Sequence, residues 1–173
     1  MMFHTRPLIS DCRGTASAEM ALIAPLLITL MFGSMELGNY FLNEHAVIKA
    51  VRDGARYAAR IDVSNYSCPS GSATGTITGL ETQIKNLTRT GSIDGLATPR
   101  LGYWTAPSTI TVSVRCVAKV SYGGTFSPLI GDIPVVKVKA DVPYADGSLF
   151  KYIGFTSVNL FLRSESEATV MGI

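Results

Sequence analysis

The sequence predicts an α+β protein in which a long N-terminal helix spans a membrane and its outer half packs on a small antiparallel sheet. Three features of the 173-residue chain predict this fold class. One apolar run is long enough to cross a bilayer, a helical pattern continues beyond it, and three later segments alternate apolar and polar residues. The length suffices for one folded domain plus an anchor.

The apolar run from Met20 to Met35 contains no charged residue. Extended through Glu36 to Leu42, it has about 23 residues, enough to cross a hydrocarbon core of about 30 Å. A buried core helix usually has an apolar run of only about 10 to 14 residues. The pattern therefore predicts a transmembrane segment at about residues 20–42.

The transmembrane segment is expected to stay attached to the chain. A secretory signal would need small residues just past the apolar run, and "SMELGNYFLN" offers no such site. Cys12 precedes the run and follows Asp11, which disfavours a lipoprotein. A cut ahead of the helix is a third possibility, and Gly14 is the small, helix-breaking residue at that place.

The orientation is predicted with the N-terminus in the cytoplasm and the long domain outside. Positive charges after the helix outnumber Arg6 and Arg13 before it, but long domains translocate largely regardless of charge. Cys68 and Cys116 form an even pair in the long domain, which suits an oxidising compartment.

The helical pattern continues to about Arg60. Apolar residues recur at intervals of three, four or their multiples, at Leu37, Phe41, Val47, Ile48, Val51, Ala55 and Ala58. From Glu19 to Arg60 the helix would be about 63 Å long at 1.5 Å per residue, so about half of it projects beyond the bilayer. The projecting half is amphipathic and is expected to cover the sheet.

Strict alternation predicts three strands, at Ile110–Tyr122, Val136–Val142 and Val158–Ala168. A short helix is expected at Leu80–Thr90, with Gly91 as its stop. The Ser-, Gly- and Thr-rich segment 61–79 and the segment 91–108 are predicted to be loops. Residues 61–173 thus form the predicted α+β domain.

The sequence offers little chemistry, and it predicts no enzyme, no metal and no cofactor. His4 and His45 lie before the membrane run and on the long helix, so neither completes a catalytic triad. Glu165 and Glu167 share the polar side of a strand, which favours a solvated face over an acid/base pair. The net charge of +2 comes without a dense basic patch, which argues against nucleic acid as a ligand.

Cys68 and Cys116 are predicted to form a disulfide. By the chain-entropy model, closing a loop of this size stabilises by about 4 kcal/mol. The alternative is that Cys116 is only a small buried apolar residue on the first predicted strand.

Two stretches, "GTASAEMALIAPLLITLMFGSMELG" and "AVRDGARYAA", carry a family resemblance. They resemble the N-terminal region of TadE-like pseudopilins, minor pilin-like components of the tight-adherence (Tad) pilus system. The resemblance covers Gly14 to about Ala59, about a quarter of the chain. Met20 stands where this family usually has an aromatic residue.

The resemblance implies a pilin-like fold and cleavage by a prepilin peptidase between Gly14 and Thr15. Residues 1–14 would then be a leader, residues 15–60 the long helix, and residues 61–173 an extracytoplasmic domain. It further implies a bacterial inner-membrane protein whose partners are membrane lipid, other pilin or pseudopilin subunits and the inner-membrane assembly platform.

The resemblance also implies a role for Glu19, which would stand fifth in the mature chain. A carboxylate in hydrocarbon costs a few kcal/mol unless it is paired, and the new α-amino group of Thr15 in a neighbouring subunit would be its counter-charge. The alternative is an interfacial carboxylate stabilised by the helix dipole. Glu36 lies about 100° around the helix from Glu19. Gly33 and Gly38 would let another helix approach it, which favours a helix-contact role.

The leading hypothesis is therefore a non-enzymatic pseudopilin that takes part in assembling a Tad-type pilus or secretion apparatus. The alternative is an unprocessed membrane protein with a periplasmic binding or scaffold domain.

Overall fold

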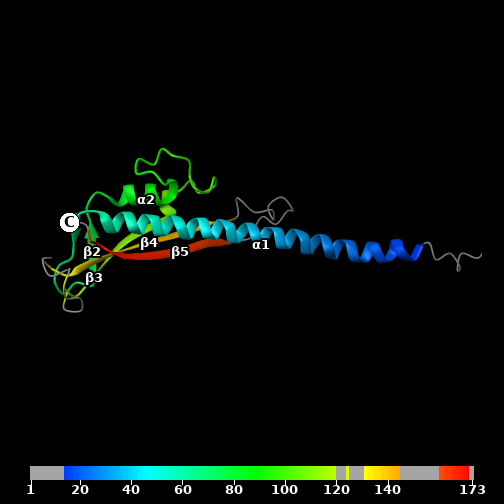
Figure 1. Ribbon diagram of the computed structural model, residues 1–173, viewed down its shortest axis with the longest axis horizontal. Coiled ribbons are helices and arrows are strands. Elements are labelled where there is room, and N and C mark those ends of the chain that lie inside the picture. Colours follow the sequence, from blue (N-terminus) through cyan, green and yellow to red (C-terminus); the bar gives the residue numbers. More distant parts are fainter. Residues whose placement is uncertain (1–13, 120–123, 125–130, 145–159, 172–173) are drawn as a thin grey trace, which may run out of the picture. The chain divides into compact units, whose positions relative to one another are not determined.

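The computed structural model describes residues 14–119, 124, 131–144 and 160–171 (Figure 1). The chain divides into two compact units, Met1–Asn39 and Tyr40–Ile173. Helix α1, Thr15–Arg60, passes unbroken from the first unit into the second. The predicted long N-terminal helix is confirmed, and it begins at Thr15.

The first part of α1, residues 15–39, exposes apolar side chains on every side of the helix. They are Met20, Leu22, Ile23, Leu26, Leu27, Ile28, Leu30, Met31, Phe32, Met35 and Leu37. Two hydroxyl groups donate back to the helix backbone, Thr29 Oγ1 to the Pro25 carbonyl at 2.8 Å and Ser34 Oγ to the Met31 carbonyl at 2.9 Å. Such internal satisfaction of polar groups is what hydrocarbon requires. Within the described part of the chain, α1 is the helix long and apolar enough to cross a membrane.

The second unit contains a five-stranded antiparallel sheet in the order β1-β2-β3-β4-β5. Each strand pairs with the next along the chain. The strands are β1 (Tyr66–Ser67), β2 (Thr74–Ile77), β3 (Ile110–Val117), β4 (Ile133–Pro143) and β5 (Phe161–Thr169).

One face of the sheet is covered by residues 40–60 of α1 and by α2, Glu81–Thr90. Every second residue of the strands faces α1, and residues three or four apart on α1 face the strands. These side chains together form one core. Its members from α1 are Val47, Ala50, Val51, Ala55 and Ala58, and those from β3, β4 and β5 include Ile110, Val114, Val136, Val138, Ala140, Val142 and Leu162. The predicted α+β architecture is therefore confirmed.

Helix α1 and strand β5 run in the same direction, and hydrogen bonds join them near both ends of β5. At one end the Tyr40 hydroxyl donates to the Phe161 carbonyl at 3.4 Å. At the other the Met171 N–H donates to the Ala59 carbonyl at 2.9 Å. The two contacts are separated by about 28 Å at 1.5 Å per helical residue.

The prediction of a loop over residues 61–79 is wrong, because β1 and β2 lie there, after a short 3₁₀ helix, Val63–Asn65. Both strands are too short to show an alternating pattern, and pairing with β3 defines them instead. The sheet has five strands where the pattern predicted three. Of the predicted strand residues, 120–122 and 158–159 lie outside the described residues.

The predicted short helix is confirmed as α2, which ends at Gly91 with φ +80° and a Gly91 N–H bond of 2.8 Å to the Leu87 carbonyl. Residues 91–106 form a loop, as predicted, followed by the 3₁₀ helix Pro107–Thr109. This loop also supplies core residues that the pattern missed. Trp104 is 1% exposed, and its Nε1 donates to Thr109 Oγ1 at 2.7 Å.

At Gly54, α1 lies close to α2. A Cβ built on Gly54 would overlap Oγ1 of Thr88 on α2 and lie 3.3 Å from the Thr88 Cβ. Nearby, the Tyr57 hydroxyl donates to Gln83 at 3.0 Å. The absence of a side chain at Gly54 therefore sets the distance between the two helices.

We expect Gly54→Ala to lower the free energy of unfolding by about 1–2 kcal/mol. In an open helix the same change raises stability by up to about 1 kcal/mol, whereas overpacking costs about 1–3 kcal/mol. Urea unfolding of the detergent-solubilised full chain, followed by the fluorescence of Trp104, measures the change.

Gly38→Ala is the matched control, because it lies on the same helix and a Cβ there meets nothing within 4 Å among the described residues. It should leave stability unchanged or higher. Thr88→Ala in the Gly54→Ala background should restore part of the loss. A Gly54→Ala chain at least as stable as the parent would contradict this packing.

Candidate functional site

The start of α1 holds the predicted processing residues. Gly14 directly precedes the helix and is exposed, and a Cβ there would meet no described atom within 4 Å. The Ser17 hydroxyl donates to the Gly14 carbonyl at 2.8 Å, which closes the first turn. Thr15 is the first helical residue, and Glu19 follows one turn later, also exposed. The structure thus places the three residues together at an open helix start.

The second group, Gly33, Glu36 and Gly38, lies near the end of the apolar run. A Cβ on either glycine would meet no described atom within 4 Å. Glu36 is only 4% exposed, whereas Met35 and Leu37 beside it are 64% and 55% exposed. Glu19 and Glu36 are about 25 Å apart along the helix axis, so the two carboxylates form separate sites.

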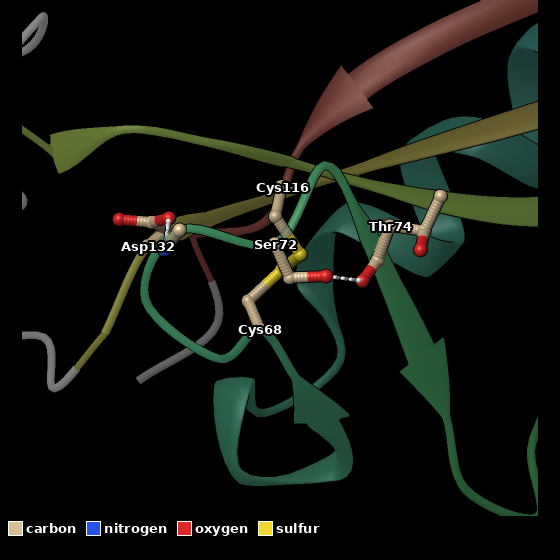
Figure 2. Close-up of a disulfide and its surroundings, with 6 residues drawn as sticks. Cys68, Ser72, Thr74, Cys116 and Asp132 are labelled. Atoms are coloured by element: carbon tan, nitrogen blue, oxygen red, sulfur yellow. Dashed lines mark hydrogen bonds between the residues drawn. A yellow bond between two sulfur atoms is a disulfide. The ribbon is translucent and has the colours of Figure 1, made fainter.

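The predicted disulfide between Cys68 and Cys116 is present (Figure 2). Cys68 follows β1 and Cys116 lies in β3, with the two Cα atoms 5.6 Å apart. The Ser72 hydroxyl donates to the Thr74 carbonyl at 2.8 Å in the chain between β1 and β2. The disulfide thus links the segment that was predicted to be a loop to β3, a central strand of the sheet.

Gly75 provides the room for this disulfide. A Cβ on Gly75 would lie 2.8 Å from the sulfur of Cys116, 2.9 Å from that of Cys68 and 2.7 Å from the Ser67 carbonyl. Asp132 holds the same region from the other side, because its carboxylate accepts from the Gly71 N–H at 2.9 Å. β2 is thus held by its pairing with β1 and β3 and by the disulfide beside Gly75, although its sequence signal is weak.

The titratable groups with shifted pKa values have structural causes. A hydrogen bond from Lys137 to Glu165, at 2.9 Å, raises the lysine pKa. The Ser64 N–H bond to Asp62 lowers the pKa of that carboxyl at the start of a 3₁₀ helix. Burial raises the pKa of Tyr66 to about 12, and its hydroxyl donates to the Ala58 carbonyl at 2.7 Å. These groups hold turns and strands and do not converge on one cavity.

Two further findings concern sites for small ligands. Among the described residues, no cluster of three His, Cys, Asp or Glu side chains could hold a metal ion. A shallow pocket on the sheet face away from α1 contains the ion pair of Arg115 and Glu167, 3.1 Å apart, and is lined by Arg115, Val117, Ile133, Val135, Glu167, Ala168 and Thr169.

These features define a class of protein: an α+β domain whose long helix extends into an exposed apolar segment suited to membrane anchoring. Residues 14–56 match the family described as TadE-like protein, which confirms the predicted resemblance. The match begins at Gly14 and covers about a quarter of the chain. No curated protein and no solved structure matches the chain.

The family match spans both parts of α1, the exposed apolar part and the part that covers the sheet. Gly54 lies inside the match, and its contact with Thr88 is a packing requirement that the sequence pattern alone could not reveal.

We expect loss of the disulfide to lower the free energy of unfolding by about 4 kcal/mol, because Cys68 and Cys116 are 48 residues apart and the bond restricts the unfolded chain. The test is urea unfolding of the Cys68→Ser, Cys116→Ser double variant beside the parent protein.

Cys12→Ser is the control and should unfold like the parent. Alkylation before reduction should modify neither Cys68 nor Cys116 in the parent chain. A double variant as stable as the parent would show that the bond adds nothing to the fold.

Proposed function

We propose that the protein is a membrane-anchored pseudopilin, a structural or assembly component of a Tad-type pilus or secretion apparatus. The observation that carries this proposal is the TadE-like match, which starts at Gly14 and runs through the whole exposed apolar part of α1. An apolar surface on every side of a helix suits lipid and neighbouring helices.

Processing is proposed between Gly14 and Thr15 by a prepilin peptidase. Gly14 is exposed and lies outside the regular helix, so the bond is in the kind of place that a peptidase can reach. The mature chain would begin at Thr15, the first residue of α1. Its new α-amino group would have a pKa of about 7.7–8 and carry a positive charge.

Glu19 is proposed to dock onto the α-amino group of Thr15 in a neighbouring subunit. Its exposure on the helix leaves it accessible to such a partner. In hydrocarbon an unpaired carboxylate costs a few kcal/mol, so pairing would fix the axial position of one helix against the next. Gly33 and Gly38, both open, would serve further helix contacts with pilus subunits or the assembly platform, whereas Glu36, 4% exposed, offers little surface to another helix.

The domain is proposed to lie in the periplasm, with the N-terminus of the chain in the cytoplasm and α1 crossing the bacterial inner membrane. The disulfide supports this orientation, because such bonds persist in oxidising compartments.

The second candidate is an unprocessed membrane protein with a periplasmic binding or scaffold domain. The observation in its favour is that the family match ends at residue 56 and leaves most of the domain unmatched. The two candidates differ at one peptide bond.

Intact-mass measurement of the protein from its native host should show a chain that begins at Thr15, with residues 1–14 removed. In a strain without the prepilin peptidase the mass should be that of the full chain. A native protein that still begins at Met1 would support the second candidate.

We expect Glu19→Ala and Glu19→Gln to be cut normally but to reduce piliation strongly, because both remove the charge that pairs with the α-amino group. The measurements are intact mass and the amount of surface pili. Glu81→Ala on α2, where Glu81 is half exposed beside Lys85, is the control and should affect neither.

Normal piliation by both Glu19 variants would eliminate the docking role. Failure of the cut would instead assign Glu19 to recognition by the peptidase.

A further inference from the structure

One end of the sheet carries a cluster of aromatic residues at the level of Tyr40 on α1. The ring of Tyr40 meets that of Tyr144 edge to face, with centroids 5.1 Å apart. The Tyr40 hydroxyl donates to the carbonyl of Phe161, the first residue of β5. The Phe41 ring lies 6.0 Å from Tyr40. These residues all belong to the second unit, so their arrangement is defined within it.

The cluster is half exposed, which distinguishes it from the core. Tyr144 is fully buried, but Phe41 is 49%, Phe161 40% and Leu160 38% exposed. The guanidinium of Arg163 lies 5.4 Å from the centre of the Phe161 ring. The cluster therefore combines a tyrosine hydroxyl, partly exposed aromatic rings and a basic side chain. This combination is typical of a surface at a boundary between apolar and aqueous surroundings.

The position of the cluster along α1 coincides with the expected edge of the bilayer. An apolar core of about 30 Å accommodates about 20 helical residues. Counted from Met20, where the charge-free run begins, these residues end near Tyr40. Because Tyr144 and Phe161 contact Tyr40, they lie at the same level of the helix axis.

We propose that this aromatic end of the domain, formed by Tyr40, Phe41, Leu160, Phe161 and Arg163, docks into the phospholipid headgroup layer of the membrane that α1 crosses. Tyr40 and Phe41 directly follow the apolar part of α1 in the chain, which favours lipid over another occupant. Aromatic and basic side chains are the residues that concentrate at this layer. The domain then rests directly on the bilayer, and α1 has no free stalk between them. This inference rests on the membrane anchoring proposed above.

The test places single tryptophans in the full chain, reconstituted in vesicles of phosphatidylethanolamine and phosphatidylglycerol. The vesicles contain lipids with a nitroxide either at the headgroup or near the acyl-chain end, which quench nearby tryptophan. The reporter is Phe161→Trp, with Leu160→Trp as a second reporter should the first fail to fold. The signal of Trp104, which is 1% exposed, is subtracted with the unsubstituted protein.

Two further variants calibrate the depth. Leu27→Trp, in the exposed apolar part of α1, reports insertion of the helix. Met171→Trp is the matched control, because Met171 is 63% exposed and bonded to Ala59 at the opposite end of the domain. It should keep its fluorescence with both lipids.

The proposal expects Phe161→Trp to lose fluorescence with the headgroup label and not with the deep label. It is overturned if Leu27→Trp is quenched by the deep label while Phe161→Trp keeps its signal. The proposal is also overturned if quenching of Phe161→Trp by the headgroup label disappears as the ratio of protein to lipid in the vesicles is raised. A second copy of the chain would then cover the cluster. If Leu27→Trp itself is not quenched, the membrane anchoring fails, and this result is distinct from the other two.

Discussion

The structure depends on one constraint: a single helix must satisfy two different surroundings along its length. Over residues 15–39, α1 exposes apolar side chains all round, while over residues 40–60 it buries only one face against the sheet. A helix that satisfies its own backbone hydrogen bonds can cross from one environment to the other without a break. The core of the domain contains residues 47–58 of this helix, so the part of α1 that covers the sheet belongs to the domain and not to the exposed apolar segment.

The second half of α1 needs small side chains at defined positions as well as an apolar face. Small residues, Ala50, Ala55 and Ala58, bring the helix close to the sheet, and Gly54 brings it close to α2. Close packing of this kind leaves little room for substitution. Part of the TadE-like pattern therefore describes the packing of the domain, and the remainder describes the anchor and the proposed processing site.

Periodicity predicted the elements that have long, regular patterns. Helix α1 and strands β3, β4 and β5 each show enough residues of one period to be recognised from the sequence. Strands β1 and β2 were missed because two or four residues cannot display a period, and their pairing depends on a disulfide and on Gly75, which act across long sequence separations. Trp104 was missed for a similar reason, since its burial is decided by a loop fold held through Thr109. The aromatic cluster needs Tyr40 and Phe161 together, 121 residues apart, and no local pattern relates them.

The parallel course of α1 and β5 has a mechanical consequence. A force that pulls α1 along its axis away from the domain acts along the strands and not across them. The contacts that α1 makes with the sheet from Tyr40 to Ala59 then bear the load together. They do so because the helix must slide along the sheet before any of these contacts is lost. The contacts at the two ends of β5 therefore hold residues 40–60 of α1 against the sheet when the helix is pulled along its axis.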